Sequence, residues 1–145
     1  MDARVNVITL AVDDFERALT FYRALGFESE GVIATEYEGD DTHPAGAIAM
    51  VHLEGGQILS LYPRSDLAKD AGIPRGPAQS GEFSLGHIVA TREDVDTVLA
   101  KAEAAGAPVT ELHDRPWGIY SGYSCDPDGH LWEFIHNPNQ TGSNT

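Results

Sequence analysis

Two segments of this chain repeat one pattern at a spacing of 80 residues, and this repeat limits the possible folds more than any other feature. In each copy an apolar run predicts a strand, an acidic residue then opens an amphipathic helix, and a glycine stands where that helix stops. The repeated positions are residues 5–12, Asp14 and Gly26 in the first copy, and residues 85–90, Asp94 and Gly106 in the second. The sequence therefore predicts a duplicated structural module.

Apolar periodicity extends each copy into a βαβββ unit. Strands are predicted at about residues 5–12, 27–37, 46–53 and 57–63, and again from about residue 84 and at 108–112, 117–125 and 129–136. The helices are predicted near residues 14–25 and after Thr91, which forms a capping-box-like start with Asp94. The predicted fold class is α+β with two tandem modules in a single domain, residues 1–145. Module one covers about 4–63, the connection 64–82, module two 83–137 and a polar tail 138–145.

The composition narrows the possible partners. A chain of 145 residues with 41% apolar residues can bury a core as one domain. Its net charge of −14 repels a phosphate backbone, so we expect no nucleic-acid partner; the charge favours either a solvated acidic surface or a groove for a cationic ligand. No apolar run approaches the ~20 residues that cross a bilayer and the start is no signal peptide, so we expect a cytoplasmic protein without a membrane partner. Cys125 is the only cysteine, which excludes an internal disulfide.

The ends of the two units correspond at a spacing of 73 residues. The segment GQILSLY at residues 56–62 aligns with GHLWEFI at residues 129–135, so Ser60 and Glu133 occupy equivalent positions. Strand alternation places Glu133 on an apolar face, where a carboxylate is costly unless it meets a cation, a donor or a metal. His87 also lies between two apolar residues of its strand. Such a histidine, taken alone, is more often a hydrogen-bonded core residue than a ligand.

Two segments carry a resemblance to a known family: LAVDDFERALTFYRALGF at residues 10–27 and DPDGHLWE at residues 126–133. With them the chain resembles the vicinal oxygen chelate (VOC) superfamily, which contains glyoxalase I, extradiol dioxygenases, fosfomycin-resistance enzymes and bleomycin-resistance proteins. The resemblance covers nearly all of residues 5–138. It implies paired modules that form an open barrel, or cup, commonly assembled as a homodimer, and it indicates the fold more strongly than the function.

The resemblance also implies where a metal would bind. Metal-using relatives take ligands from the first and last strands of each module, positions that correspond here to Val7, Ser60, His87 and Glu133. Valine offers no donor and a serine hydroxyl is a poor ligand for a divalent ion, so only the second half keeps metal-binding side chains. We therefore expect no metal; if Zn, Ni, Mn or Fe is present, His87 and Glu133 are its expected ligands. A hydrogen bond between His87 and Glu133, either as an acid–base dyad or merely satisfying both groups, is the expected use of the pair.

An aromatic segment, RPWGIYSGY at residues 115–123, precedes the last turn. Aromatic side chains give broad, stiff contact surfaces, which suits a small organic ligand, and the resemblance places this hairpin at the rim of the cup. The expected ligand-binding residues are Val7, Ser60, Tyr62, Arg115, Trp117, Tyr120 and Tyr123. The alternative, that these aromatics build the sheet core and a dimer contact, stays open.

Three functions are compatible with the sequence. The preferred one is a metal-free binding protein, not an enzyme, that holds a small aromatic or cationic molecule in an aromatic-lined cup. The second is a lyase or dioxygenase-like enzyme in which His87 and Glu133 hold a labile metal, or use the same pair for acid–base chemistry without one. The third is a structural or regulatory dimer that binds no small molecule.

Overall fold

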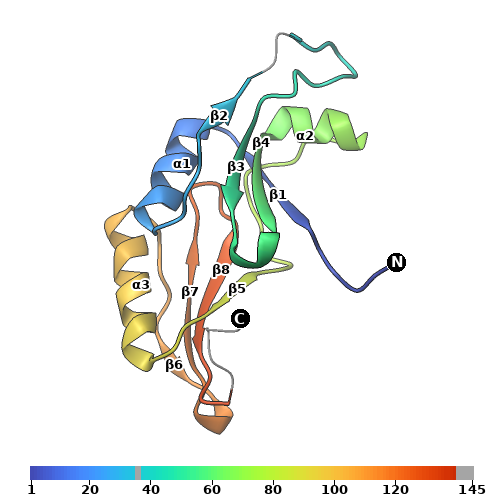
Figure 1. Cartoon of the computed structure of the whole chain (residues 1–145). Helices are drawn as coiled ribbons and strands as arrows, with labels where there is room; N and C mark the ends of the chain where they lie inside the picture. The colour runs from blue at the N-terminus through green and yellow to red at the C-terminus, as the bar shows by residue number, and fades with distance from the viewer. Residues whose placement is uncertain (35–36, 140–145) are drawn as a thin grey trace. The chain divides into compact units, whose positions relative to one another are not determined.

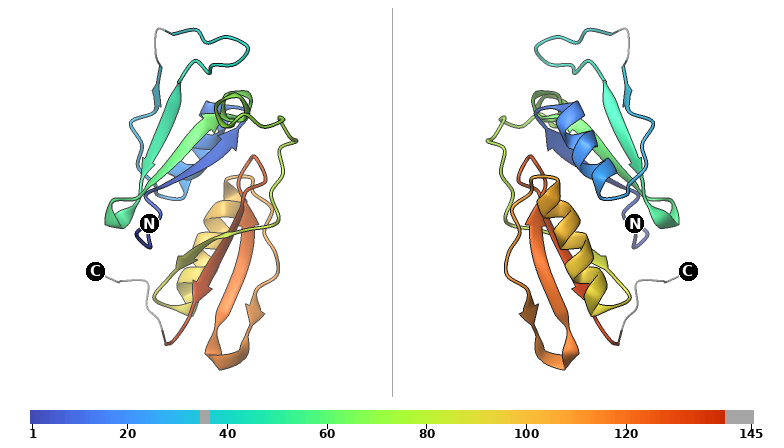
Figure 2. Two further views of the ribbon diagram at one scale, coloured as in Figure 1. Left: turned by 90° about the vertical axis from the view of Figure 1, so that its right-hand side faces the viewer. Right: turned by 90° about the vertical axis from the view of Figure 1, so that its left-hand side faces the viewer.

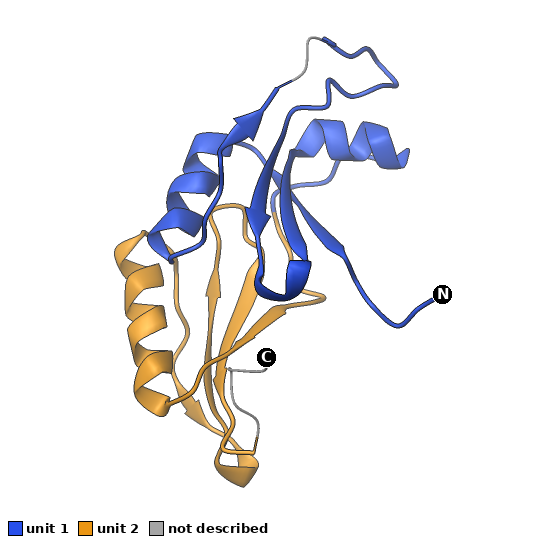
Figure 3. Ribbon diagram, in the orientation of Figure 1, with its two compact units in different colours: residues 1–78 blue, residues 79–145 orange. Residues whose placement is uncertain are grey.

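The computed structural model describes residues 1–34 and 37–139. The chain divides into two compact units, residues 1–78 and residues 79–145 (Figure 3). Each unit contains one four-stranded sheet, with the strand orders β1-β4-β3-β2 and β5-β8-β7-β6. These two orders are the same pattern, so the predicted α+β fold of two βαβββ modules is confirmed. The division between the units falls within the connection predicted at residues 64–82.

The first sheet combines one parallel and two antiparallel pairings (Figure 1). Its strands are β1 (Val7–Val12), β2 (Val32–Ile33), β3 (Ile48–His52) and β4 (Ile58–Pro63). Strand β1 runs parallel to β4, and β3 lies antiparallel to both β4 and β2. Strands β3 and β4 are joined through a short 3₁₀ turn, Glu54–Gly56, in which Gly55 and Gly56 both have positive φ.

Helix α1 (Phe15–Ala24) covers one face of the first sheet (Figure 2). The helix begins where predicted because the side chain of Asp14 accepts a hydrogen bond from the backbone N–H of Arg17, at 3.1 Å. Gly26, at φ 105°, follows the C-cap residue Leu25. Its apolar stripe is buried against the sheet, and the core of the unit comprises Leu10, Val12, Ala18, Leu19, Phe21, Tyr22, Ala49, Val51, Leu59 and Leu61.

A second helix, α2 (Arg64–Ala71), follows β4 directly and was not predicted. Its first residue is buried, and the Arg64 guanidinium donates to the Asp13 carboxylate at 2.8 Å and to the Ala11 carbonyl at 3.2 Å. These bonds attach the helix to the end of β1. The sequence predicted an irregular connection over residues 64–82 because it contains several prolines and glycines. All of them lie after residue 71, so the eight residues before them are free to form a helix.

The second unit repeats the arrangement with small changes. Its elements are β5 (Leu85–Ile88), α3 (Arg92–Ala104), β6 (His113–Asp114), a 3₁₀ turn (Pro116–Gly118), β7 (Tyr120–Cys125) and β8 (Leu131–His136). The predicted capping box is confirmed: the Asp94 backbone N–H donates to Thr91 Oγ1 at 3.1 Å, and the Thr91 N–H donates to the Asp94 carboxylate at 3.2 Å. Buried Val95, Leu99 and Ala102 hold α3 against the sheet.

Two edge strands are shorter than predicted. The expected strand at residues 27–37 is reduced to Val32–Ile33, and positions 35–36 lie outside the described residues. The strand expected at residues 108–112 gives way to a single bridge between Val109 and Ser124, followed by β6 directly after the predicted end. Positions 140–145 of the predicted tail also lie outside the described residues.

Within residues 1–34 and 37–139, no helix is long and apolar enough to cross a membrane. The longest, α3, has 13 residues, whereas a bilayer span takes about 20. Its sequence, REDVDTVLAKAEA, also carries charged residues along its exposed side.

Candidate functional site

The second sheet has two chemically different faces. In the β7–β8 pairing, Tyr123 lies opposite Glu133 and Gly122 lies opposite Phe134. A Cβ atom on Gly122 would lie 2.7 Å from Leu99 of α3, so Gly122 and Phe134 belong to the side that packs against the helix, here called the α3 face. Because strand side chains alternate, the opposite side, here called the Tyr123 face, carries Ser121, Tyr123, Cys125, Leu131, Glu133 and Ile135.

Glu133 and Tyr123 form the polar centre of the Tyr123 face. Both side chains are half-buried, and they are direct cross-strand partners. Burial raises the pKa of the Tyr123 phenol, and the charge of Glu133 and a hydrogen bond to its carboxylate raise that pKa further, whereas the Arg115 guanidinium lowers it. The predicted neighbour of the Glu133 carboxylate was an imidazole, whereas its cross-strand neighbour in the structure is the Tyr123 phenol.

His87 lies on the other side of the sheet, which corrects the predicted pairing. In the parallel β5–β8 ladder, Glu133 is opposite Gly86 and His87 is opposite Phe134. The His87 and Phe134 rings contact edge to face, with centroids 6.1 Å apart, and His87 is exposed. The structure therefore contradicts the expected hydrogen bond between His87 and Glu133, because the two side chains project from opposite faces of one sheet.

A shallow pocket of about 450 Å³ opens on the Tyr123 face. Tyr123 and Leu131 line it from the sheet, and residues 81–84 line it from the segment before β5. The lining residues are Gly81, Glu82, Phe83, Ser84, Thr110, Tyr123 and Leu131. The backbone N–H of Tyr123 donates to Thr110 Oγ1 at 2.9 Å, so the strand that carries the tyrosine is tied to the neighbouring segment. The pocket is therefore built within the second unit, and two aromatic residues, Phe83 and Tyr123, line it.

The other aromatic candidates of the second unit lie away from this pocket. Tyr120 belongs to the α3 face, where its hydroxyl donates to Asp96 at 2.8 Å and the Arg92 guanidinium stacks on its ring at 4.0 Å. The same guanidinium pairs with Asp114 at 2.7 Å. Tyr120 thus fastens β7 and β6 to helix α3 and does not line this pocket, and its ligand contact stays a prediction.

Trp117 and Arg115 occupy the turn between β6 and β7, at the end of the sheet distant from the β7–β8 connection (Figure 1). Trp117 is 81% exposed and has a left-handed backbone conformation, with φ 65°. The Arg115 guanidinium donates to Ser121 Oγ at 3.3 Å, which directs it toward the Tyr123 face. Of the two predicted contacts, Arg115 is close to the polar centre of that face, and Trp117 does not line the pocket.

The predicted residues of the first unit share one face of its sheet. Val7 lies opposite Ile58 and Ser60 opposite Thr9, so strand alternation puts Val7, Ser60 and Tyr62 on the same side. Val7 is 50% exposed, whereas Ser60 is buried and its hydroxyl has no hydrogen-bond partner among the described residues. Tyr62 is half-buried, and burial raises the pKa of its phenol, with further effects from Asp70 and Asp66.

These donors do not fit a metal centre. Of the four positions implied by the resemblance, Val7 has no donor, Ser60 offers a buried neutral hydroxyl, and the remaining two side chains lie on opposite faces of one sheet. In the part of the chain that the structure describes, no group of three or more histidine, cysteine, aspartate or glutamate side chains comes close enough to hold a metal ion. His87 and Glu133 therefore cannot jointly ligate one ion in this arrangement.

Sequence reasoning missed Phe83 and Thr110 as pocket residues. Phe83 is 55% exposed and lies in the connection, where no periodic pattern distinguishes a binding residue from a linker residue. Thr110 lies in a segment predicted as a strand, which gave no sign that its hydroxyl bonds to β7. An available signal was the aromatic residue Phe83 itself, which stands directly before the predicted strand and after a run of small and polar residues.

The comparisons with known proteins agree with the duplicated fold. The family model described as Glyoxalase/Bleomycin resistance protein/Dioxygenase superfamily matches residues 4–134. A glyoxalase-related enzyme from Fulvimarina pelagi is 27% identical with a TM-score of 0.77, and the match covers 99% of this chain and 97% of that one. Lactoylglutathione lyase from Agrobacterium tumefaciens is 24% identical with a TM-score of 0.63, covering 93% and 94%.

A third solved structure shows a metal-bound relative. It is a mutant of the fosfomycin resistance protein FosX from Listeria monocytogenes, in complex with Mn(II) and 1S,2S-dihydroxypropylphosphonic acid. It is 17% identical with a TM-score of 0.65, and the match covers 92% of this chain and 90% of that one. At this identity the likeness concerns the fold alone. No curated protein matches the sequence.

Proposed function

Because the chain belongs to the Glyoxalase/Bleomycin resistance protein/Dioxygenase superfamily, we propose that it is a metal-free protein that binds a small organic molecule on the Tyr123 face. The observation that carries this proposal is the pocket of about 450 Å³ with Phe83, Tyr123 and Leu131 in its lining. Ligand sites are typically concave and apolar, with a few polar groups that fix orientation. Here the polar groups are the Thr110 hydroxyl and the neighbouring Glu133 carboxylate.

The separation of His87 from Glu133 supports binding over metal-dependent catalysis. A lyase or dioxygenase centre needs several donors that converge on one ion, and an acid–base dyad needs two groups within hydrogen-bond reach. In the β5–β8 register the two side chains project to opposite sides. The lyase from Agrobacterium tumefaciens and the manganese-bound protein from Listeria monocytogenes share the fold, but the described residues of this chain lack the converging donors that such chemistry requires.

Metal analysis tests the first half of the proposal. Tag-free protein is assayed for Mn, Fe, Ni and Zn before and after chelation and reconstitution, beside His87→Ala and Glu133→Ala. We expect no near-stoichiometric metal that depends on either side chain. Stoichiometric metal that is lost in both variants would overturn the proposal and restore the enzyme hypothesis.

A thermal-shift screen with small organic molecules tests the second half. A ligand that binds only the folded protein stabilises it by about 2.7 kcal/mol at 100 times its Kd. We expect saturable stabilisation that EDTA leaves unchanged and that Phe83→Ala reduces. Ile73→Ala is the matched control, because Ile73 is 59% exposed and lies in the other unit. Stabilisation that disappears with EDTA, or a full screen without any Phe83-dependent shift, would contradict the proposal.

The assembly is a separate part of this proposal. We expect a homodimer, as the family resemblance implies, and sedimentation velocity measures it directly. A monomer over the micromolar range would remove the dimer and leave the proposed pocket intact, because every residue that lines the pocket belongs to the second unit of one chain.

A further inference from the structure

We propose that the ligand of the Tyr123-face pocket is an organic cation that carries an aromatic ring, with Glu82 and Glu133 as the residues that select its charge. This inference rests on the proposed function and goes beyond it by naming the ligand class. The inference follows from the side chains that line or border the pocket and from the order of charged side chains along the sheet.

Two aromatic side chains supply the apolar contact. Tyr123 is half-buried and Phe83 is 55% exposed, and both line the pocket. An aromatic ligand ring gains contact area against both, and a cation near either ring face is attracted by the ring quadrupole. Phe83 lies in an irregular segment directly before β5, so it is not committed to the core of the sheet.

Two carboxylates supply the charge. Glu82 lines the pocket directly. Glu133 lies opposite Tyr123 and two residues from Leu131 on the same face, so it borders the pocket from the side of the sheet. A positive ligand group in the pocket gains Coulomb energy from both carboxylates, whereas a ligand carboxylate or phosphate at the same place is repelled by them.

The basic group of this face stands at the other end. Arg115 donates to Ser121, which follows the turn at the start of β7, whereas Leu131 and the lining residue Tyr123 lie further along the sheet toward the β7–β8 connection. Along the face the charges therefore run from Arg115 through Glu133 to Glu82. The pocket lies at the acidic end of this series, which favours a cation over an anion.

Three probes of similar size separate the contributions of ring and charge. Benzyltrimethylammonium is the aromatic cation, benzyl alcohol the neutral compound and phenylacetate the anion, and each is titrated into ¹⁵N-labelled protein by NMR. We expect the amide signals of the lining residues to move most with the cation. Its Kd should be about two- to fivefold lower than that of benzyl alcohol, the range of one exposed cation–π or charge contact. Phenylacetate should bind most weakly.

Charge-removing variants identify the selecting residues. Glu82→Gln and Glu133→Gln should each raise the Kd of benzyltrimethylammonium about two- to fivefold and leave that of benzyl alcohol unchanged. Glu103→Gln is the matched control, because this exposed residue of α3 removes the same charge without lining this pocket. Glu82 is exposed in an irregular segment, so its substitution does not threaten the fold.

The outcomes separate the ligand class from the proposed function. Equal or tighter binding of benzyl alcohol or phenylacetate would overturn the cation proposal and leave the pocket as a binding site. An equal loss of affinity for benzyltrimethylammonium in the Glu103→Gln control would also overturn the cation proposal, because the effect would then come from net charge alone. Signals of the lining residues that none of the three probes moves would overturn the cation proposal alone, because the proposed binding of a small organic molecule is tested by the full thermal-shift screen.

Discussion

The two units share their hairpins and differ in the strand that precedes the helix. Every cross-strand pair between β3 and β4 has its counterpart between β7 and β8 at a constant spacing of 73 residues: Met50 and Ser60 correspond to Tyr123 and Glu133. The parallel strands do not keep this correspondence. The spacings of 80 for β1 and 73 for β4 would pair His87 with Leu131, but His87 pairs with Phe134, three residues further along.

A shift by an odd number of residues moves side chains to the other face of a sheet. In the first unit, Val7 and Ser60 therefore share a face, whereas in the second unit His87 and Glu133 do not. The same two positions of a duplicated module thus have different geometries in its two copies. Equivalence along the sequence is not sufficient evidence for equivalence in space.

The two units also differ in where their first helix begins relative to the repeat. In the first unit Asp14 is the N-cap of α1, whereas its counterpart Asp94 is the third residue of α3 and bonds back to Thr91 in a capping box. Helix α3 consequently begins three residues earlier than the repeat predicts. Strand β5 has four residues where β1 has six, and the first residue of α3, Arg92, stands where the repeat places Val12, the last residue of β1.

Core substitutions at equivalent hairpin positions should lower the free energy of unfolding most, and by similar amounts in the two units. Leu61 and Phe134 correspond in the two hairpins and are 0% and 3% exposed. We expect Leu61→Ala to lower the free energy of unfolding by about 2–5 kcal/mol and Phe134→Ala by about 3–5 kcal/mol, from lost burial and the cavity left behind. Urea denaturation measures both, with Ile73→Ala as the exposed control. A large effect in one unit alone would show that the two hairpins are not equivalent.

Removing the helix caps should have an effect of about 1 kcal/mol in each unit. Asp14→Ala removes the acceptor for the Arg17 N–H, and Thr91→Ala removes the acceptor for the Asp94 N–H. We expect the Thr91 variant to be at least as destabilised as the Asp14 variant, because Thr91 belongs to a reciprocal capping box. Thermal and urea denaturation of both variants check this. A Thr91→Ala protein as stable as the wild type would argue against the early helix start.

The titration of Tyr123 should depend on Glu133 and not on His87. Burial and the Glu133 carboxylate raise the pKa of the Tyr123 phenol, so Glu133→Gln should lower its midpoint, as followed by ¹³Cζ-tyrosine NMR. His87→Ala and the charge-matched Glu111→Gln should leave it unchanged. Because the folded pKa is raised, this interaction stabilises the protein below the ordinary tyrosine pKa of 10.0 and is lost as the pH rises through the raised value. A midpoint shift in His87→Ala would contradict the face assignment.

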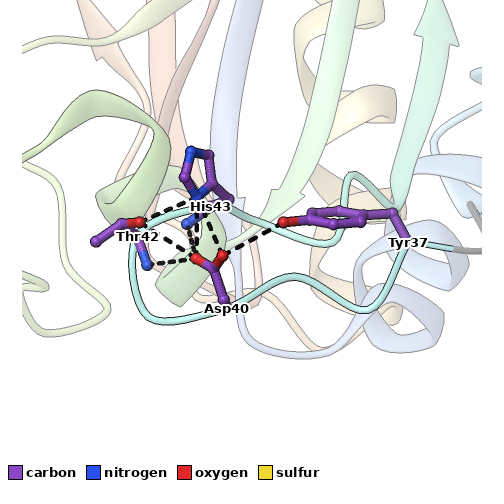
Figure 4. A network of polar contacts seen from close by, with 4 residues as sticks. All are labelled: Tyr37, Asp40, Thr42 and His43. Atoms are coloured by element: carbon purple, nitrogen blue, oxygen red, sulfur yellow. Dashed lines mark hydrogen bonds and ion pairs between the residues drawn. The ribbon is translucent and has the colours of Figure 1, made fainter.

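The smallest effect is expected in a loop that distinguishes the first unit from the second. Between β2 and β3, the Asp40 carboxylate accepts hydrogen bonds from the backbone N–H groups of Thr42 and His43, at 2.8 and 2.7 Å, and contacts the His43 ring and the Tyr37 hydroxyl (Figure 4). The bond from the Thr42 N–H, followed by those from His43, holds the pKa of Asp40 well below its usual 3.8. The order of the loop should persist at pH 3.8 and be lost only as the pH falls through the lowered value.

NMR signals of the loop amides check this expectation. Asp40→Asn should disturb the loop at neutral pH with little change in global stability, whereas Asp41→Asn is the adjacent control. An Asp40 carboxyl that titrates at 3.8 or above would contradict the network. The corresponding connection in the second unit is the short Pro116–Gly118 turn, which has no such carboxylate.

Much of the fold could be predicted from local patterns. The stripe of α1, the box at Thr91 and the strand alternation around Glu133 each depend on residues close in sequence. Helix α2 could not be predicted from local patterns, because its attachment depends on a hydrogen bond between Arg64 and Asp13, which are far apart in the sequence. The pocket could be predicted only in part: Tyr123 was expected, whereas Phe83 required the placement of the connection against β7 and β8.

The predicted His87–Glu133 pair depended on a quantity that local sequence does not contain, the register of two parallel strands far apart in the chain. Parallel strands are joined by a crossover of many residues, so no tight turn sets their register as it does in a hairpin. Tyr120 illustrates the same limit, since its hydroxyl is committed to Asp96 on the helix side.

Side-chain NOEs of His87 decide whether this residue and Glu133 occupy opposite faces of the second sheet, on which the proposed metal-free site depends. In ¹³C-labelled protein we expect NOEs between the imidazole protons of His87 and the ring protons of Phe134, whose ring centroids lie 6.1 Å apart. We also expect NOEs between the Tyr123 ring and the Glu133 side chain, as required by their cross-strand pairing. NOEs from the His87 ring to the Glu133 γ-protons, without contacts to Phe134, would contradict this arrangement and return the pair to a shared site.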